Sequence, residues 1–203
     1  MHRPAICIVT LSFVLFALVS CAREASTPSA TQAGPVRFFR EHVTVRPSEG
    51  RTAVTGIYCF RNESDDTTDA VMRYPFPIDR FHIGPFRVRA WEERNGVFEP
   101  IGFASGEYSM TWRMSMKPRE EKVIRVEYVQ EIKKHHALYI VTTTREWGRP
   151  LERAEFEFRV PRSLLDVEPS FEPTRVLERA DTVIYYLEKT EFMPESDLSI
   201  TWK

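Results

Sequence analysis

The stretch YSMTWRMSM, residues 108–116, decides the fold class of this chain of 203 residues. Large apolar side chains stand at every second position of it: Tyr108, Met110, Trp112, Met114 and Met116. Serine, threonine and arginine fill the positions between them. Because successive side chains of a strand point to opposite faces of a sheet, this alternation predicts a strand with one packed face and one face in water. Such strands are typical of antiparallel sheets.

The same alternation recurs along the rest of the chain. It is clear in AEFEFRV, residues 154–160, and weaker in nine other segments: 37–45, 53–60, 70–76, 86–91, 97–103, 122–132, 137–143, 182–188 and 197–202. Only 161–169 and 174–181 show a helical pattern, and each is long enough for only one or two turns. Many short strands separated by turn-rich segments predict an all-β fold, an antiparallel β-sandwich of immunoglobulin-like or larger size with little helix beyond the signal peptide.

The N-terminal residues indicate export. After Arg3, residues 5–19 are apolar or uncharged, and these 15 residues are fewer than the roughly 20 that a membrane-spanning helix needs. Leu18, Val19, Ser20 and Cys21 then resemble the lipobox of bacterial lipoproteins. The resemblance implies cleavage before Cys21, a diacylglycerol thioether on its sulfur and acylation of its amino group. Two or more acyl chains hold a protein stably in a lipid bilayer, whereas one chain does so only marginally.

The resemblance to a lipobox also predicts the domain organisation. Residues 1–20 are expected to be a removed signal peptide. Residues 21–35 contain the lipidated cysteine and a tether rich in Ala, Ser, Thr, Pro and Gly. Residues 36–203 are expected to form a single β-sandwich domain. Ala22, in place of Asp, favours the outer membrane facing the periplasm in a double-membraned cell; otherwise the outer face of the cytoplasmic membrane is expected.

Charge and cysteine content limit the function classes. Lys and Arg number 28 and Asp and Glu 29, so no basic excess points to nucleic acid as a partner. If Cys7 leaves with the signal and Cys21 carries lipid, Cys59 has no cysteine with which to form an internal disulfide. We expect Cys59 to be a buried, small apolar residue.

A second resemblance concerns the expected domain. IYCFRNES, VMRYPFPID and FRVRAW are similar to the N-terminal part of VIT-type domains and of a group of exported bacterial β-sandwich proteins. Asn62 and the run 76–78 occupy the positions of the shared Asn and Phe-Pro-hydrophobic motifs. VIRVEYVQ, LYIVTTTREWG and ERAEFEFRVP match later strands of the same group. The resemblance implies a sandwich that takes part in interactions, and it brings no catalytic residue.

Three groups of residues contain side chains that can bind metals. Met110, Met114 and Met116 could bind copper(I), but they share a face with aromatic residues and are expected in the core. Adjacent histidines at 135 and 136 would point to opposite faces of a strand, which favours an exposed hairpin tip. The acidic run 62–69 lacks the spacing of a calcium loop and is expected to be a solvated turn. No metal and no cofactor is therefore predicted.

The sequence favours a binding function over catalysis. The chain contains no Gly-x-Ser-x-Gly motif and no phosphate-binding glycine loop, and the sequence does not pair any two carboxylates. If Phe86, Val88 and Ala90 face the core, the outer face carries Arg87, Arg89 and Trp91. An indole among guanidinium groups can bind a sugar or a protein. The predicted function is a non-enzymatic envelope lipoprotein that binds a protein or glycan partner. The alternatives are an envelope hydrolase acting on polysaccharide or peptidoglycan and a metal-binding periplasmic protein.

Overall fold

A computed structural model describes residues 34–203 and confirms an all-β sandwich whose sheets remain open. The predictions made for residues 1–33, including lipidation of Cys21, lie outside the described residues. Within residues 34–203, no helix combines the length and the apolar character needed to cross a membrane.

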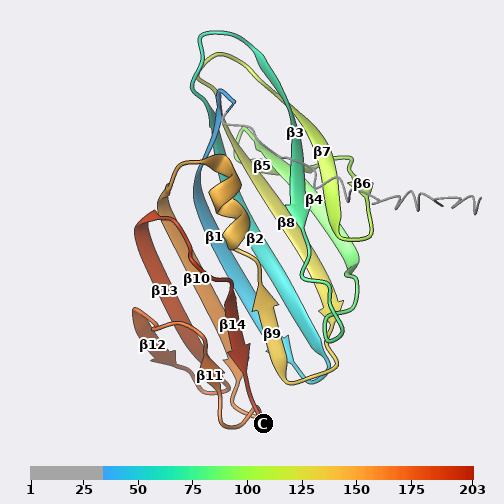
Figure 1. The fold of residues 1–203 in the computed structure, drawn as a ribbon, viewed down its shortest axis with the longest axis vertical. Coiled ribbons are helices and arrows are strands. Elements are labelled where there is room, and N and C mark those ends of the chain that lie inside the picture. Colours follow the sequence, from blue (N-terminus) through green and yellow to red (C-terminus); the bar gives the residue numbers. More distant parts are fainter. Residues whose placement is uncertain (1–33) are drawn as a thin grey trace, which may run out of the picture.

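One layer of the sandwich is an eight-stranded sheet (Figure 1). In spatial order its strands are β12 (Arg175–Glu178), β13 (Thr182–Phe192), β10 (Leu151–Pro161), β1 (Val36–Ser48), β2 (Arg51–Asn62), β8 (Glu121–Glu131), β4 (Phe86–Arg94) and β5 (Val97–Pro100). One face of this sheet packs on the second layer, and we call the opposite face the outer face.

The second layer is divided between two small sheets and a short helix, which lie in front of the large sheet in Figure 1. One small sheet contains β3 (Thr68–Pro75), β7 (Ser109–Met116) and β6 (Ala104–Ser105), and the other contains β11 (Glu168–Pro169), β14 (Leu198–Thr201) and β9 (His136–Tyr139). The helix η1 (Thr142–Trp147) is a 3-10 helix. Gly148 ends it in the left-handed conformation, at a φ of 68° that glycine adopts without strain.

Within residues 34–203, all strand pairs but one are antiparallel. The exception is β1 with β10, which are parallel and in register from Arg40 opposite Arg153 to Val45 opposite Phe158. Parallel neighbours need a crossover connection. Here the chain leaves the small sheet at β9, passes through η1 and re-enters the large sheet as β10, so the second layer supplies part of that connection.

The core fills the space between the layers. The alternating face of 108–116 is buried as predicted at Met110, Trp112, Met114 and Met116, whereas Tyr108 precedes β7 and is 54% exposed. Burying such large apolar side chains is the main favourable contribution to folding.

A row of tyrosines crosses the core. The Tyr58 hydroxyl on β2 lies 2.9 Å from the Tyr74 hydroxyl on β3 and 2.9 Å from the Tyr139 hydroxyl on β9. Tyr58 therefore joins the large sheet to both small sheets at one point. Hydrogen bonding satisfies polar groups that would otherwise be costly to bury.

All eleven predicted strands are present, but the minor elements differ from the prediction. Residues 174–181, with their helical pattern, contain strand β12, because pairing with β13 outweighs the local pattern. Residues 161–169 form a turn followed by β11. The strand expected over 137–143 ends at Tyr139, and η1 begins at Thr142.

Candidate functional site

The predicted surface centres on Trp91 in β4, which is half-buried on the outer face of the large sheet. The guanidinium carbon of Arg89 lies 5.4 Å from the indole centroid, and that of Arg125 on β8 lies 5.3 Å from it. Arg125 also lies 5.8 Å from the ring of Phe98 on β5. Guanidinium groups at such distances are attracted to the negative faces of aromatic rings. We call Arg89, Trp91, Phe98 and Arg125 the tryptophan patch.

Strand register explains why these residues meet. Trp91 is paired with Arg125, while Arg89 is paired with Glu127 two residues further along β8. The side chains of these four residues, Arg89, Trp91, Arg125 and Glu127, therefore lie on one face. Glu127 accepts hydrogen bonds from both Arg89, at 3.2 Å, and Arg125, which fixes both guanidinium groups beside the indole.

Arg87 lies apart from the tryptophan patch. The register between β4 and β8 shifts between Phe86 and Arg89, and Arg87 takes a φ of 55° at this irregularity. Its guanidinium group lies over the ring of Phe86. The structure thus brings together Arg89 and Trp91 of the predicted trio and separates Arg87, because a β-bulge breaks the simple alternation on which the prediction relied.

Sequence reasoning missed two members of the patch. Phe98 follows the β4–β5 hairpin closely, and the hairpin signal Asn95-Gly96 could have placed it beside β4. Arg125 comes from a strand more than thirty residues later, and no local signal indicates its pairing with Trp91. Register between distant strands had to be known to find it.

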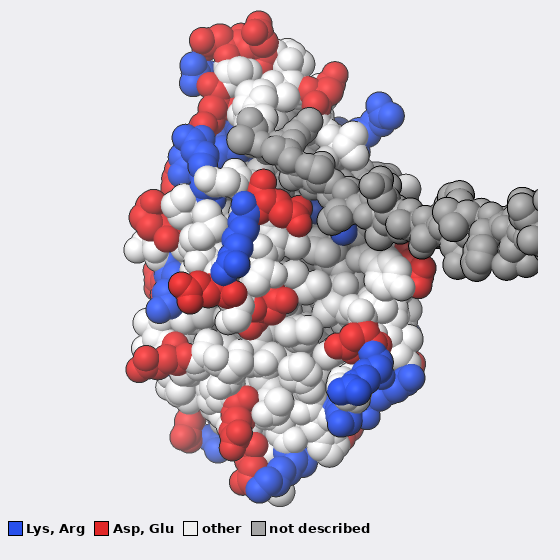
Figure 2. Space-filling view, viewed as in Figure 1, with Lys and Arg blue, Asp and Glu red and all other residues white. Residues whose placement is uncertain are grey.

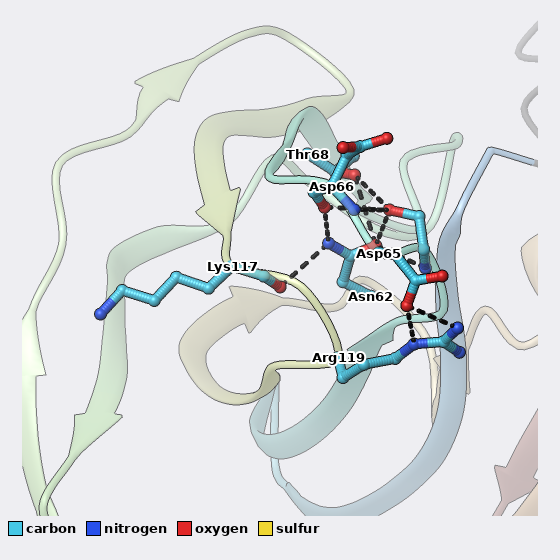
Figure 3. A network of polar contacts seen from close by, with 7 residues as sticks. Asn62, Asp65, Asp66, Thr68, Lys117 and Arg119 are labelled. Atoms are coloured by element: carbon cyan, nitrogen blue, oxygen red, sulfur yellow. Dashed lines mark hydrogen bonds and ion pairs between the residues drawn. The ribbon is translucent and has the colours of Figure 1, made fainter.

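The acidic run 62–69 is a structural turn, organised by Asn62 (Figure 3). The buried Asn62 amide donates to the carbonyl oxygens of Asp66, Met116 and Lys117, and its oxygen accepts from Ser64 and Thr68. The acidic side chains are directed elsewhere.

Two of these acids are paired with arginines. Arg119 donates to Asp65 through Nε and Nη2, at 3.0 and 2.9 Å. Glu63 pairs with Arg37 and Arg149, and these hydrogen bonds, that of Arg149 foremost, lower its pKa against the opposing effect of burial. The run 62–69 therefore forms a turn, as predicted, and it connects β2 to the β7–β8 turn. Asn62, which organises it, is also the Asn of the motif shared in the second resemblance.

The histidines are also occupied by structural contacts. His82 is buried, with Nδ1 at 2.9 Å from Asp79 Oδ1 and Nε2 at 3.1 Å from the carbonyl oxygen of His136. His135 stacks on Trp202, with 5.8 Å between ring centroids. Across residues 34–203, no group of three or more His, Cys, Asp or Glu side chains is arranged to hold a metal ion.

Cys59 is buried on the outer-face side of β2, and burial raises the pKa of its thiol. This agrees with its prediction as a buried, small apolar residue, because a reactive thiol needs exposure and a lowered pKa.

Surface charge is mixed on the side of the small sheets. Figure 2 shows acidic and basic side chains interspersed there, with broad uncharged areas between them. This face thus carries no continuous field of one sign of the kind that attracts nucleic acid.

A groove with a volume of about 720 Å³ lies on the outer face, at the end of the strands. Its acidic lining residue is Asp181, whereas Arg46, Arg159 and Arg179 are basic. The groove therefore does not bring two carboxylates together, which is the arrangement that glycoside hydrolysis requires.

The described residues thus belong to the class of open, two-layered β-sandwiches. The larger sheet carries a surface of arginine and aromatic side chains. No family model matches the chain, and no curated protein matches it.

Solved structures resemble the fold. A protein from Legionella pneumophila, described as a candidate nutrient binding protein, aligns with a TM-score of 0.66 at 13% identity, over 85% of this chain and 68% of its own. An M1 zinc metallopeptidase from Deinococcus radiodurans aligns with a TM-score of 0.52 at 15% identity, over 86% of this chain. The match spans 44% of the length of that peptidase. At these identities the similarity establishes the shared β-rich fold alone.

Proposed function

We propose that this protein is a non-enzymatic lipoprotein of the bacterial cell envelope, held in the lipid bilayer by acylated Cys21, and that it binds a protein or glycan partner. The anchor rests on the resemblance of residues 18–21 to a lipobox, and the flexible composition of residues 22–35 would leave the domain free to reorient near the membrane.

The tryptophan patch is the observation that carries the binding role. The indole of Trp91 is partly accessible beside two guanidinium groups that are held in place by Glu127. Tryptophan and arginine are the residues most often found at the energetic centre of interfaces. A flat indole can also stack on the apolar face of a sugar ring. The description of the Legionella structure as a candidate nutrient binding protein supports a binding role by analogy of fold.

The test compares wild-type protein with Trp91→Ala. Full-length protein in detergent is screened against envelope polysaccharides and peptidoglycan fragments, and in parallel is crosslinked to envelope proteins of its own cell. We expect one partner to be retained by wild type and bound about tenfold or more weakly by Trp91→Ala. Val97→Ala, which alters an apolar residue that is 62% exposed on the neighbouring strand, serves as the matched control.

Four outcomes would count against this proposal. Equal binding by wild type and Trp91→Ala would remove the patch, and a large fall in the thermal midpoint of Trp91→Ala would make Trp91 a structural residue. Release of reducing ends from peptidoglycan or polysaccharide by the purified protein would replace the binding role by the hydrolase alternative. Stoichiometric metal in elemental analysis would favour the metal-binding alternative.

A further inference from the structure

The groove at the end of the outer face contains an unusual pair of like charges. Arg46 on β1 is paired with Ala53 on β2, and Arg159 on β10 is paired with Ile184 on β13. Since β1 and β10 are parallel and in register up to Val45 and Phe158, Arg46 and Arg159 are the next residues of the two strands. The row across four strands therefore reads Ala53, Arg46, Arg159, Ile184.

Adjacent like charges on neighbouring strands are destabilising unless something neutralises them. Arg159 is neutralised, because Glu157 accepts from its Nε at 2.7 Å. Arg46 forms no ion pair with any carboxylate of the described residues, and the groups beside it in the row are an alanine and another arginine. Burial and, second, the charge of Arg159 lower the pKa of Arg46, and the nearby carboxylates of Glu157 and Glu127 oppose this shift only in part.

The surroundings shape a recess around this arginine. Pro47 and Ser48 follow Arg46, and the turn before β13 adds Arg179 and Asp181 to the lining of the groove. The recess of about 720 Å³ is within the size range of small-molecule sites. Its charged lining comprises three guanidinium groups and one carboxylate. Because Glu157 neutralises Arg159, the lining keeps an excess of one positive charge, from Arg46 and Arg179 against Asp181.

We propose that this groove binds a phosphate group, with Arg46 as the principal donor and Arg159 and Arg179 beside it. A guanidinium group presents donors in a planar fork that matches phosphate oxygens, and the negative charge of a phosphate group would balance the excess positive charge of the recess. The apolar lining from Pro47, Ala53, Pro161 and Ile184 leaves room for an organic substituent on the phosphate. This site is separate from the tryptophan patch and does not rest on the function proposed above.

Calorimetric titration of the full-length protein in detergent tests the proposal. The probes are inorganic phosphate, glycerol 3-phosphate as the soluble form of a lipid headgroup, and sodium chloride at matched ionic strength. We expect saturable binding of a phosphate probe with a dissociation constant on the order of 1 mM or tighter. Tighter binding of glycerol 3-phosphate would identify a lipid headgroup as the source, and equal binding would identify free phosphate.

Two variants locate the site. Arg46→Gln should weaken phosphate binding about tenfold or more, because it removes charge-assisted hydrogen bonds. Arg113→Gln removes an exposed arginine from β7 in the other layer and should leave binding unchanged. Without phosphate, the thermal midpoint of Arg46→Gln should stay close to that of wild type, since the substitution removes both the repulsion by Arg159 and the attraction by Glu157 and Glu127.

Phosphate should then raise the midpoint of wild type and of Arg113→Gln, but not that of Arg46→Gln. The proposal is overturned if neither phosphate probe binds the folded protein beyond the chloride control. It is equally overturned if both variants lose affinity to the same extent.

Discussion

The hydroxyl of Tyr139 donates a hydrogen bond of 3.4 Å to Oε2 of Glu41, so a strand of a small sheet contacts a carboxyl group buried in the large sheet. Oε1 of Glu41 has no hydrogen-bond partner among the described residues. Burial raises the pKa of Glu41 to about 8, and the Tyr139 hydrogen bond opposes this shift only in part. Glu41 is therefore neutral in the folded protein at neutral pH.

This pKa makes stability depend on pH. The folded state holds the proton up to about pH 8, whereas an unfolded glutamate releases it near pH 4.5. The contribution of Glu41 is thus fully present below pH 4.5 and is lost as the pH rises to about 8, with a limiting slope of about 1.4 kcal/mol per pH unit. Because Gln stays neutral, Glu41→Gln should gain stability relative to wild type across this window.

Urea denaturation of wild type and Glu41→Gln at pH 5, 6, 7 and 8 measures this difference. Other titrating groups contribute equally to both proteins, so they cancel in the subtraction. Parallel stability profiles would mean that Glu41 is already ionised in the folded state, contrary to the expectation.

Gly56 is required by the position of the Tyr58 ring. A Cβ atom at residue 56 would lie 1.9 Å from the Tyr58 hydroxyl oxygen and 2.3 Å from Cζ. Movement of the ring would disturb the hydrogen bonds of its hydroxyl with two other tyrosines and its T-shaped contact with the ring of Tyr74. Gly56→Ala should therefore lower the free energy of unfolding by about 1–3 kcal/mol, the range for overpacked cores.

Gly102→Ala is the matched control, because no atom lies within 4 Å of its added Cβ. Chemical denaturation of both variants gives the comparison. Equal stabilities for the two variants would show that Tyr58 can repack without cost, and the bridge between the three sheets would then be looser than its hydrogen bonds indicate.

Asn62 offers a test of the turn in Figure 3. Asn62→Ala removes the amide and leaves buried groups of the turn without partners, including the carbonyl oxygen of Met116. Each such group costs about 1–3 kcal/mol, so a loss of at least about 3 kcal/mol is expected. Asp65→Ala breaks only an ion pair in which Asp65 is 87% exposed, and it should change stability by less than about 1 kcal/mol. Similar losses in thermal unfolding for both variants would assign the turn to its charges.

The sequence patterns predicted which segments form strands, but they did not predict which strands are neighbours in a sheet. The alternation of 108–116 and 154–160 reports burial directly, and these segments are β7 and β10. Strand pairing cannot be inferred from such local patterns, since the parallel contact of β1 with β10 joins residues more than a hundred positions apart. Arg46 beside Arg159 could be predicted only from the register of β1 with β10, and Trp91 beside Arg125 only from that of β4 with β8. The burial of Glu41 could not be predicted either, because a charged residue in a strand is ordinarily expected on the solvent-exposed face.

The lipid anchor is tested at Cys21. The resemblance to a lipobox predicts that the Cys21 sulfur carries diacylglycerol and that several acyl chains hold the protein at the membrane. Cys21→Ser should abolish metabolic labelling with a fatty acid and move the protein from the membrane fraction to the soluble fraction. Cys59→Ser is the control, since Cys59 is buried and should take up no lipid. Persistent labelling of Cys21→Ser would refute lipidation at this residue, and loss of labelling with continued membrane association would indicate a second means of attachment.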